Sequence, residues 1–185
     1  MSNSSQRCVL KQGAVIWFTG LSGTGKTTLA EAFAEKAPCA YYHLDGDVLR
    51  NGLCKDLSFS AEDRSENIRR ASEVAGILAD SGLLVLASFI SPFAQDRQLA
   101  KSCIGEQRFV EIFIDTPLDV CEDRDVKGLY ARARQGEIPS FTGIDSPYER
   151  PENPSLHFQY PFSIEDAVQK ILDHCSQRFF ADILV

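Results

Sequence analysis

Short apolar runs alternate with helical patterns along most of the chain. The runs predict strands at 14–19, 40–45, 83–90 and 109–115, and a shorter, weaker one at 156–158. Apolar positions with helical spacing fall between them, at about 26–36, 61–80, 93–103, 117–124 and 163–178. Because strands and helices alternate, the pattern predicts an α/β fold: a mostly parallel sheet of about five strands with helices on both faces.

Residues 125–155 break this alternation. Three glycines and four prolines stand there among basic residues: Gly128, Gly136, Gly143, Pro139, Pro147, Pro151 and Pro154. A long irregular stretch in a compact domain is usually functional or disordered. A basic helical pattern at 126–134, with apolar Phe141 and Ile144 after it, argues against simple disorder. We interpret the segment as a lid; the alternative is a flexible surface loop.

Composition describes an ordinary globular chain. With 185 residues, 44% hydrophobic and 24% charged, it suits one domain over residues 1–185. No apolar run approaches the length of a membrane span, and the first dozen residues lack a signal-peptide core. The six cysteines include no C-x-x-C pair, which favours reduced thiols over a zinc site or a disulfide framework. We therefore expect a cytoplasmic protein that does not associate with membranes.

Charge narrows the choice of partner. The net charge of −7 argues against nucleic acid as the main partner. The basic residues nevertheless cluster in two stretches, at 64–70 and 124–134. Since a cleft can focus a field opposite in sign to the net charge, a small anionic ligand remains compatible with this chain.

The most specific motif is Gly20-Leu-Ser-Gly-Thr-Gly-Lys-Thr27, which matches the phosphate-binding pattern G-x-x-x-x-G-K-[ST]. Glycines let backbone N–H groups turn toward a phosphate chain. Lys26 reaches the β- and γ-phosphates in this pattern, and the Thr27 hydroxyl binds Mg²⁺. A predicted strand precedes the loop and a predicted helix follows it, so an anion is favoured there. The loop predicts a site for a nucleoside triphosphate.

Ligands of parallel sheets bind beyond the carboxyl ends of the strands. No acid follows the third predicted strand, but Asp45 and Asp47 follow the second. One of them can hold Mg²⁺ through water while the other accepts the proton of an attacking hydroxyl. The alternative is that Asp45-Gly-Asp47 is only a turn.

Further residues together suit a second, anionic substrate, although each polar one by itself is more often a solvated surface residue. Arg64 and Asn67 share one helical face, and Arg50 follows Asp47 by three residues. Phe59 and Phe141 stand outside apolar runs, so the two rings can sandwich a flat ring if they lie near the site. The alternative, which the usual burial of phenylalanine favours, is that each belongs to the core.

Longer blocks carry a family resemblance over about residues 13–160. They are Phe18–Thr28, Leu44-Asp-Gly-Asp47, Asp56–Arg70, Ser88-Phe-Ile-Ser-Pro92, Arg124-Asp-Val-Lys-Gly-Leu-Tyr130, Gly136-Glu-Ile138, Phe141-Thr-Gly-Ile-Asp145 and Pro151-Glu-Asn-Pro154. In these blocks the chain resembles adenylylsulfate kinase (APS kinase). That resemblance implies the three-layer P-loop NTPase fold, with ATP as co-substrate, Mg²⁺ as cofactor, a homodimer, and a role in sulfate assimilation. The implied reaction is phosphorylation of the 3′-hydroxyl of adenosine 5′-phosphosulfate (APS).

The resemblance also implies residue roles. The ATP phosphates would be held by Gly20, Ser22, Gly23, Thr24, Gly25, Lys26, Thr27 and Thr28. Catalysis would involve Asp47 as general base, with Lys26, Asp45 and Ser91, and the metal ligands would be Thr27 and Asp45. The acceptor site would comprise Asp47, Arg50, Phe59, Arg64, Asn67, Ile90, Ser91, Lys127, Ser140 and Phe141. Within it the arginines and Asn67 would bind the phosphosulfate, and the two phenylalanines the adenine.

Some positions depart from the family pattern: Val48, Ser140, and the Ala94-Gln95 pair. Two competing interpretations stay open, a kinase for another small alcohol and a nucleotide switch without transfer. The switch is disfavoured because no Asn-Lys-x-Asp segment is present, and Asp125-Val-Lys-Gly128 lies in the predicted lid. The apolar C-terminal segment 179–185 is expected to pack on the core, with a dimer contact as the alternative.

Overall fold

The computed structural model describes residues 10–181; the polar start of the chain and the last four residues of the apolar C-terminal segment lie outside them. Its centre is a five-stranded parallel sheet in the order β2-β3-β1-β4-β5. The strands are β1 (Ala14–Thr19), β2 (Tyr41–Asp45), β3 (Leu84–Ser88), β4 (Phe109–Asp115) and β5 (Leu156–Gln159). All five predicted strands are therefore present, and the parallel sheet is confirmed.

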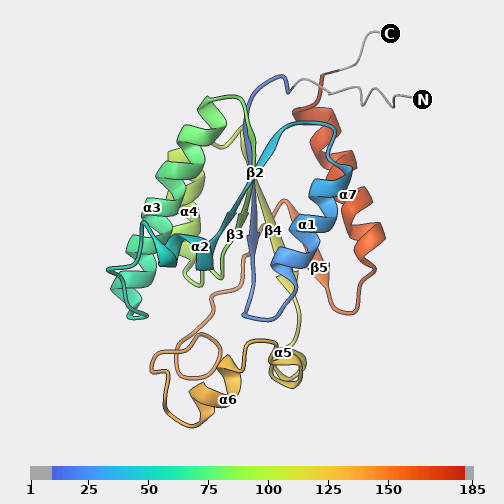
Figure 1. Cartoon of the computed structure of the whole chain (residues 1–185). Coiled ribbons are helices and arrows are strands. Elements are labelled where there is room, and N and C mark those ends of the chain that lie inside the picture. The colour runs from blue at the N-terminus through green and yellow to red at the C-terminus, as the bar shows by residue number, and fades with distance from the viewer. Residues whose placement is uncertain (1–9, 182–185) are drawn as a thin grey trace, which may run out of the picture.

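Helices cover both faces of the sheet, which gives the expected three layers (Figure 1). One face carries α1 (Lys26–Lys36) and α7 (Ile164–Arg178), and the other carries α3 (Ala61–Asp80) and α4 (Ala94–Ile104). The short helices α5 (Leu118–Arg124) and α6 (Leu129–Arg134) lie beyond the carboxyl ends of the strands. Within residues 10–181, no helix combines the length and apolarity that a bilayer crossing requires.

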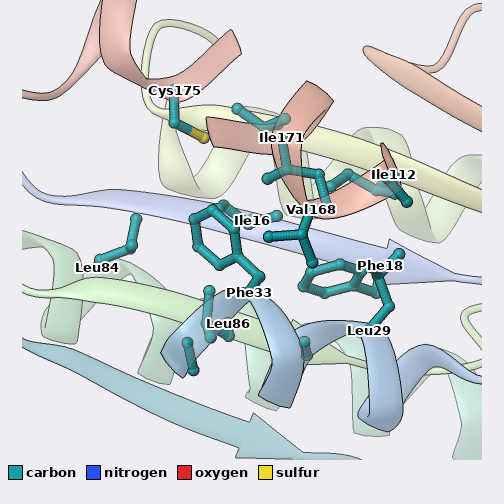
Figure 2. Close-up of a cluster of buried hydrophobic side chains, with 14 of the residues drawn as sticks. Ile16, Phe18, Leu29, Phe33, Leu84, Leu86, Ile112, Val168, Ile171 and Cys175 are labelled. Atoms are coloured by element: carbon teal, nitrogen blue, oxygen red, sulfur yellow. The ribbon is translucent and has the colours of Figure 1, made fainter. Parts of the chain in front are cut away.

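The core is anchored on β1, whose six residues are all buried. Its side chains alternate between the faces: Ile16 and Phe18 join the cluster under α1 and α7, and Val15 and Trp17 join the one under α3 and α4. Figure 2 shows Phe18 and Phe33 packed among aliphatic side chains of the first cluster. Because β1 is the central strand and is fully buried, the loop that begins at Gly20 starts from a well-packed part of the protein.

The structure corrects two boundaries and adds one helix. The third strand ends at Ser88, two residues before its predicted end. A helix that the sequence did not predict, α2 (Gly46–Asn51), follows β2 directly. The lid helix begins at Leu129 rather than at 126, because Gly128 before it is left-handed, with φ of 64°. The Asp125 carboxylate accepts hydrogen bonds from the N–H groups of Tyr130 and Ala131 and so caps this helix.

The start of α3 is fixed by local hydrogen bonds. The Ser60 hydroxyl accepts from the Asp63 N–H at 3.1 Å, which is the N-cap hydrogen bond of this helix. The Asp63 carboxylate accepts from the N–H of Ser58 at 2.9 Å, and the Ser60 N–H donates to the Ser58 hydroxyl at 3.3 Å. This cap places Arg64 and Asn67 in the first two turns of α3, at the lid end of the helix.

Candidate active site

A cavity of about 840 Å³ lies between the carboxyl edge of the sheet and the lid. It brings together most of the residues that the sequence predicted for the site: Ser22, Gly23, Gly25, Lys26, Thr27, Thr28, Asp45, Asp47, Arg50, Phe59, Arg64, Asn67, Ile90, Ser91, Lys127 and Phe141. Three predicted residues do not line it: Gly20, Thr24 and Ser140. These three residues shape the loop and the lid through their backbone geometry and hydrogen bonds, as described below.

The phosphate loop needs glycine at positions where its backbone is left-handed. Gly23 and Gly25 have φ of 76° and 98°. A Cβ on Gly20 would lie 2.5 Å from the carbonyl oxygen of Ile114, so no other residue fits there. Thr24 is buried and its hydroxyl donates to the carbonyl of Leu21 at 3.1 Å. Gly20 and Thr24 therefore shape the loop from behind rather than face the cavity.

The Lys26 ammonium is folded onto its own loop. Its Nζ donates to the carbonyl oxygens of Gly20 at 2.9 Å and Leu21 at 2.6 Å. Burial lowers the pKa of Lys26 from 10.5 to about 8, against the opposing effect of the nearby Asp45 and Asp47 carboxylates. A phosphate group in the cavity would favour the charged lysine again.

The two aspartates open a helix, so the interpretation of Asp45-Gly-Asp47 as a simple turn is wrong. Asp45 caps α2, because its Oδ1 accepts from the Asp47 N–H at 2.9 Å. Its other oxygen, Oδ2, accepts from the Thr27 hydroxyl at 3.1 Å. The two groups predicted to bind the metal are thus in direct contact.

Asp47 reaches across the cavity mouth to the lid. Its carboxylate forms an ion pair with Lys127, and the two side chains are 69% and 58% exposed. The contact joins the first turn of α2 to the segment between α5 and α6.

On the other side of the cavity, Arg64 is buried and ties the lid to α3. Its Nε donates to the Phe59 carbonyl at 3.0 Å and its Nη2 to the Ser140 carbonyl at 2.8 Å. Burial, reinforced by the nearby Arg50 guanidinium, lowers the pKa of Arg64 to about 10. Ser140 contributes this carbonyl from a left-handed backbone with φ of 57°.

Asn67 lies beside this arginine and lines the same cavity. Its side chain is buried, and its Oδ1 has no hydrogen-bond partner within residues 10–181. A buried polar atom without a partner is costly, so Asn67 is a good candidate for ligand contact.

The two phenylalanines occupy different environments. Phe59 is 46% exposed, and the Arg50 guanidinium lies 4.4 Å from its ring centroid. Phe141 is 6% exposed and meets the Tyr130 ring edge-on at 5.1 Å, in a small lid core with Cys121 and Ala133. Both rings line the cavity, and their stacking on a ligand stays a prediction.

Ser91 is part of the cavity wall, but its side chain points into the protein. Its residue is 1% exposed, and its hydroxyl accepts from the Trp17 indole at 3.1 Å and donates to Thr19 at 2.9 Å. This placement favours a positioning role, because the hydroxyl is already committed to two partners. The catalytic role implied by the resemblance stays a prediction.

Sequence reasoning noted the basic cluster of the lid but gave no role to Arg124 or Arg132. Both line the cavity, and Arg124 donates to the Gly23 carbonyl at 3.2 Å and lies 5.1 Å from the Tyr160 ring centroid. Six basic side chains and four acidic ones line this cavity, so it is net positive in a chain of net charge −7. The local field therefore suits phosphorylated ligands.

The phosphate loop and a cluster of basic side chains line one lidded cavity, an arrangement typical of a nucleotide-dependent kinase of the P-loop NTPase fold. Within that class the chain belongs to the adenylylsulphate kinase family, whose model matches residues 12–159.

Individual relatives agree with this assignment. The adenylyl-sulfate kinase of Enterobacter sp. (strain 638) is 52% identical over 165 residues, which cover 88% of this chain and 82% of that protein. The structure of the Mycobacterium tuberculosis APS kinase in complex with AMPPNP and APS is 51% identical, with a TM-score of 0.84, and the match covers 88% of this chain and 96% of that one. A hexameric APS kinase from Thiobacillus denitrificans is 30% identical, with a TM-score of 0.67, over 94% of this chain and 30% of that one.

Proposed function

We propose that this protein transfers the γ-phosphoryl group of ATP to the 3′-hydroxyl of APS, giving 3′-phosphoadenylyl sulfate. The observation that carries the proposal is the single cavity in which the phosphate loop faces Arg50, Arg64 and Asn67 across Asp47. The M. tuberculosis relative, which shares 51% of its sequence, was solved with an ATP analogue and APS together.

In the proposed reaction, Asp47 accepts the proton of the 3′-hydroxyl as the oxygen attacks the γ-phosphorus. The new O–P bond forms while the bond from the γ-phosphorus to the bridging oxygen breaks, and ADP leaves. Phosphoryl transfer depends mainly on position and charge. Lys26 supplies positive charge at the β- and γ-phosphates, and the loop N–H groups orient them. Asp47 becomes available once Lys127 turns from it to the substrates.

Thr27 and Asp45 are the proposed ligands of Mg²⁺, with Asp45 acting through water. Their oxygens lie 3.1 Å apart at the donor side of the cavity, and hydroxyl and carboxylate oxygens suit this ion. Bound Mg²⁺ neutralises charge on the β- and γ-phosphates.

The acceptor would lie under the lid. Arg50, Arg64 and the accessible side of Asn67 are the proposed partners of its phosphosulfate, and Phe59 and Phe141 of its adenine. The lining residues Ile90, Ser91 and Lys127, with Ser140 just behind them, complete this side of the cavity. The buried Arg64 and the half-buried Arg50, with the Asn67 side chain in the same cavity, support an anionic ligand with polar groups.

The test is an assay of ATP-dependent phosphorylation of APS against a panel of other small alcohols. We expect turnover of APS well above that of every other acceptor. Absence of turnover by folded, ATP-binding protein contradicts the proposal, and selective turnover of another alcohol would assign the same site to a different acceptor.

We further propose a role in sulfate assimilation, a cytoplasmic location, and one catalytic unit spanning residues 1–185. The proposed oligomer is a homodimer, on the family resemblance, whereas the T. denitrificans relative is named hexameric. Light scattering of the purified protein distinguishes the two assemblies.

A further inference from the structure

Behind the acceptor side of the cavity, a set of buried and partly buried polar side chains joins the segment after β3 to the end of the lid. We call this set the polar clasp: Trp17, Thr19, Ser91, Arg97 and Tyr148. Ile90, Ser91 and Pro92 line the cavity, and Tyr148 comes from the stretch in which the lid returns to the sheet.

Arg97 is the charged centre of the clasp. It lies in the first turns of α4 and is 4% exposed. Its Nη1 donates to the Ser91 carbonyl at 2.8 Å, its Nη2 donates to the Glu149 carbonyl at 2.7 Å, and its Nε forms an ion pair with Glu111 at 2.9 Å. The guanidinium thus binds two segments at once: the cavity segment, Ile90–Pro92, and the lid return, Tyr148–Glu149. Its planar fork is needed for this, because a lysine presents its donors from one atom.

Ser91 needs such support because its backbone is left-handed, with φ of 41°, which is unfavourable for a residue other than glycine. The Arg97 contact satisfies its carbonyl in the buried interior, and the Trp17 indole holds its hydroxyl from β1. The strained turn is what directs Ile90 and Pro92 along the cavity wall.

Thr19 connects the same turn to Tyr148. Its hydroxyl donates to the Ile90 carbonyl at 2.7 Å, so its single proton is used there. It accepts from Ser91 at 2.9 Å, and the Tyr148 hydroxyl, 2.9 Å away, is therefore also a donor to it. Burial raises the pKa of Tyr148 to about 12, which keeps this donor protonated.

Backbone contacts run parallel to the clasp. The Glu149 N–H donates to the Pro92 carbonyl at 2.8 Å, and the Ala94 N–H donates to the Glu149 carboxylate at 2.6 Å. The lid return and the cavity segment are therefore connected at several points within a few residues.

We propose that Arg97 and Tyr148 are positioning residues of the kinase reaction, which set the Ile90–Pro92 wall of the acceptor site and couple it to the lid. Neither needs to touch substrate for this role. The proposal rests on the proposed function, because it assigns the acceptor to this side of the cavity. It predicts that weakening the clasp impairs use of the acceptor and leaves the ATP site unchanged.

The test compares Arg97→Lys and Tyr148→Phe with the unaltered protein, in steady-state kinetics with each substrate varied in turn. Tyr148→Phe removes one hydrogen bond and should lower kcat/KM for APS about three- to tenfold, mostly through KM. Arg97→Lys cannot keep all three contacts of the guanidinium, with the two carbonyls and Glu111, and should lower kcat/KM for APS about ten- to a hundredfold. The KM for ATP should stay within about twofold in both.

Arg108→Lys is the matched control. Arg108 also donates to a backbone carbonyl, that of Ile104, through Nε at 3.1 Å and Nη2 at 2.8 Å, and it pairs with Asp80, but it lies at the amino end of β4. It should lower thermal stability without changing either KM.

Three results overturn the proposal: unchanged APS kinetics in Tyr148→Phe, equal loss with ATP and APS, or the same kinetic pattern in Arg108→Lys. Since Tyr148→Phe keeps the ring, it gives a decision even where Arg97→Lys fails to fold. Failure of the proposed function is a different outcome, because the unaltered protein would then show no turnover of APS.

Discussion

The side of the cavity proposed for ATP, here called the donor half, and the side proposed for APS, the acceptor half, are built in different ways. The donor half is a single stretch, Ser22–Thr28, that leaves the buried central strand and enters α1. The acceptor half is assembled from α2, the start of α3, the segment after β3 and the lid. In the donor half the backbone itself sets the geometry. In the acceptor half, side chains bind the carbonyls of distant segments, as Arg64 does with Ser140, 76 positions away.

This difference implies a division of mechanical roles. The phosphate loop is fixed by its own backbone and by a fully buried strand, so we expect it to change little when ATP binds. A nearly preformed site lowers the entropy cost of binding. The acceptor half is adjustable, because its parts are held by a few hydrogen bonds and by the small lid core around Phe141. Variants should therefore affect the two substrates separately.

The largest expected effect is at Asp47, which stands between the halves. Asp47→Ala should lower kcat about 10²–10⁴-fold, the usual contribution of a general base, and leave ATP affinity nearly intact. Steady-state kinetics and ATP titration measure the two quantities. Asp123→Ala removes an acid outside the cavity lining and should change neither. An unchanged kcat in Asp47→Ala would refute the base assignment.

Phe141→Ala should weaken APS binding by about 1–3 kcal/mol if the ring stacks on adenine, by analogy with aromatic–base stacking, and leave ATP binding unchanged. Because Phe141 is also part of the lid core, Phe141→Leu is the control that keeps most of the packing. Calorimetric titration with APS decides. Recovery of full APS affinity in the leucine variant would show that packing, not stacking, is what the ring provides.

Lys26 predicts a pH dependence confined to the donor half. Its pKa of about 8 means that the free protein loses this charge above that pH, whereas bound phosphate favours the charged form. Binding then takes up a proton, so ATP affinity should fall by up to about tenfold per pH unit above 8. Lys26→Arg keeps its charge and should show a flat profile. A flat profile in the unaltered protein would contradict the depressed pKa.

The same shift has a defined consequence for stability. The unfolded chain carries Lys26 with a pKa near 10.5, above the value in the folded protein, so unfolding takes up a proton between about pH 8 and 10.5. The contribution of this group to the free energy of unfolding therefore rises with pH across that window.

The smallest effect is expected from the ion pair that connects the halves. Lys127→Ala removes the contact with Asp47, but both side chains are more than half exposed. Exposed pairs contribute at most about 1 kcal/mol, so the free energy of unfolding measured in urea should change by less than that. A much larger loss would mean that this pair, rather than Arg64, holds the lid.

Sequence patterns predicted the strands well because buried parallel strands are continuous apolar runs, as β1 shows. They missed α2, a six-residue helix whose cap, Asp45, is also a turn-forming residue. They placed the lid helix too early, since the left-handed Gly128 and the cap from Asp125 lie outside any hydrophobic period. The roles of Arg97 and Tyr148 could not be predicted, because the sequence does not show which distant group a side chain will bind.

The sequence by itself determined the sheet, the phosphate loop and the types of residue around it. Those features depend on local spacing, on glycine conformations and on apolar periodicity, which a linear pattern contains. Only the tertiary structure decided that the Ser91 hydroxyl points into the core, that Asp45 contacts Thr27, and that Arg64 holds the lid. Each of these is a hydrogen bond between distant segments, and its geometry exists only once the parallel strands bring their carboxyl ends together.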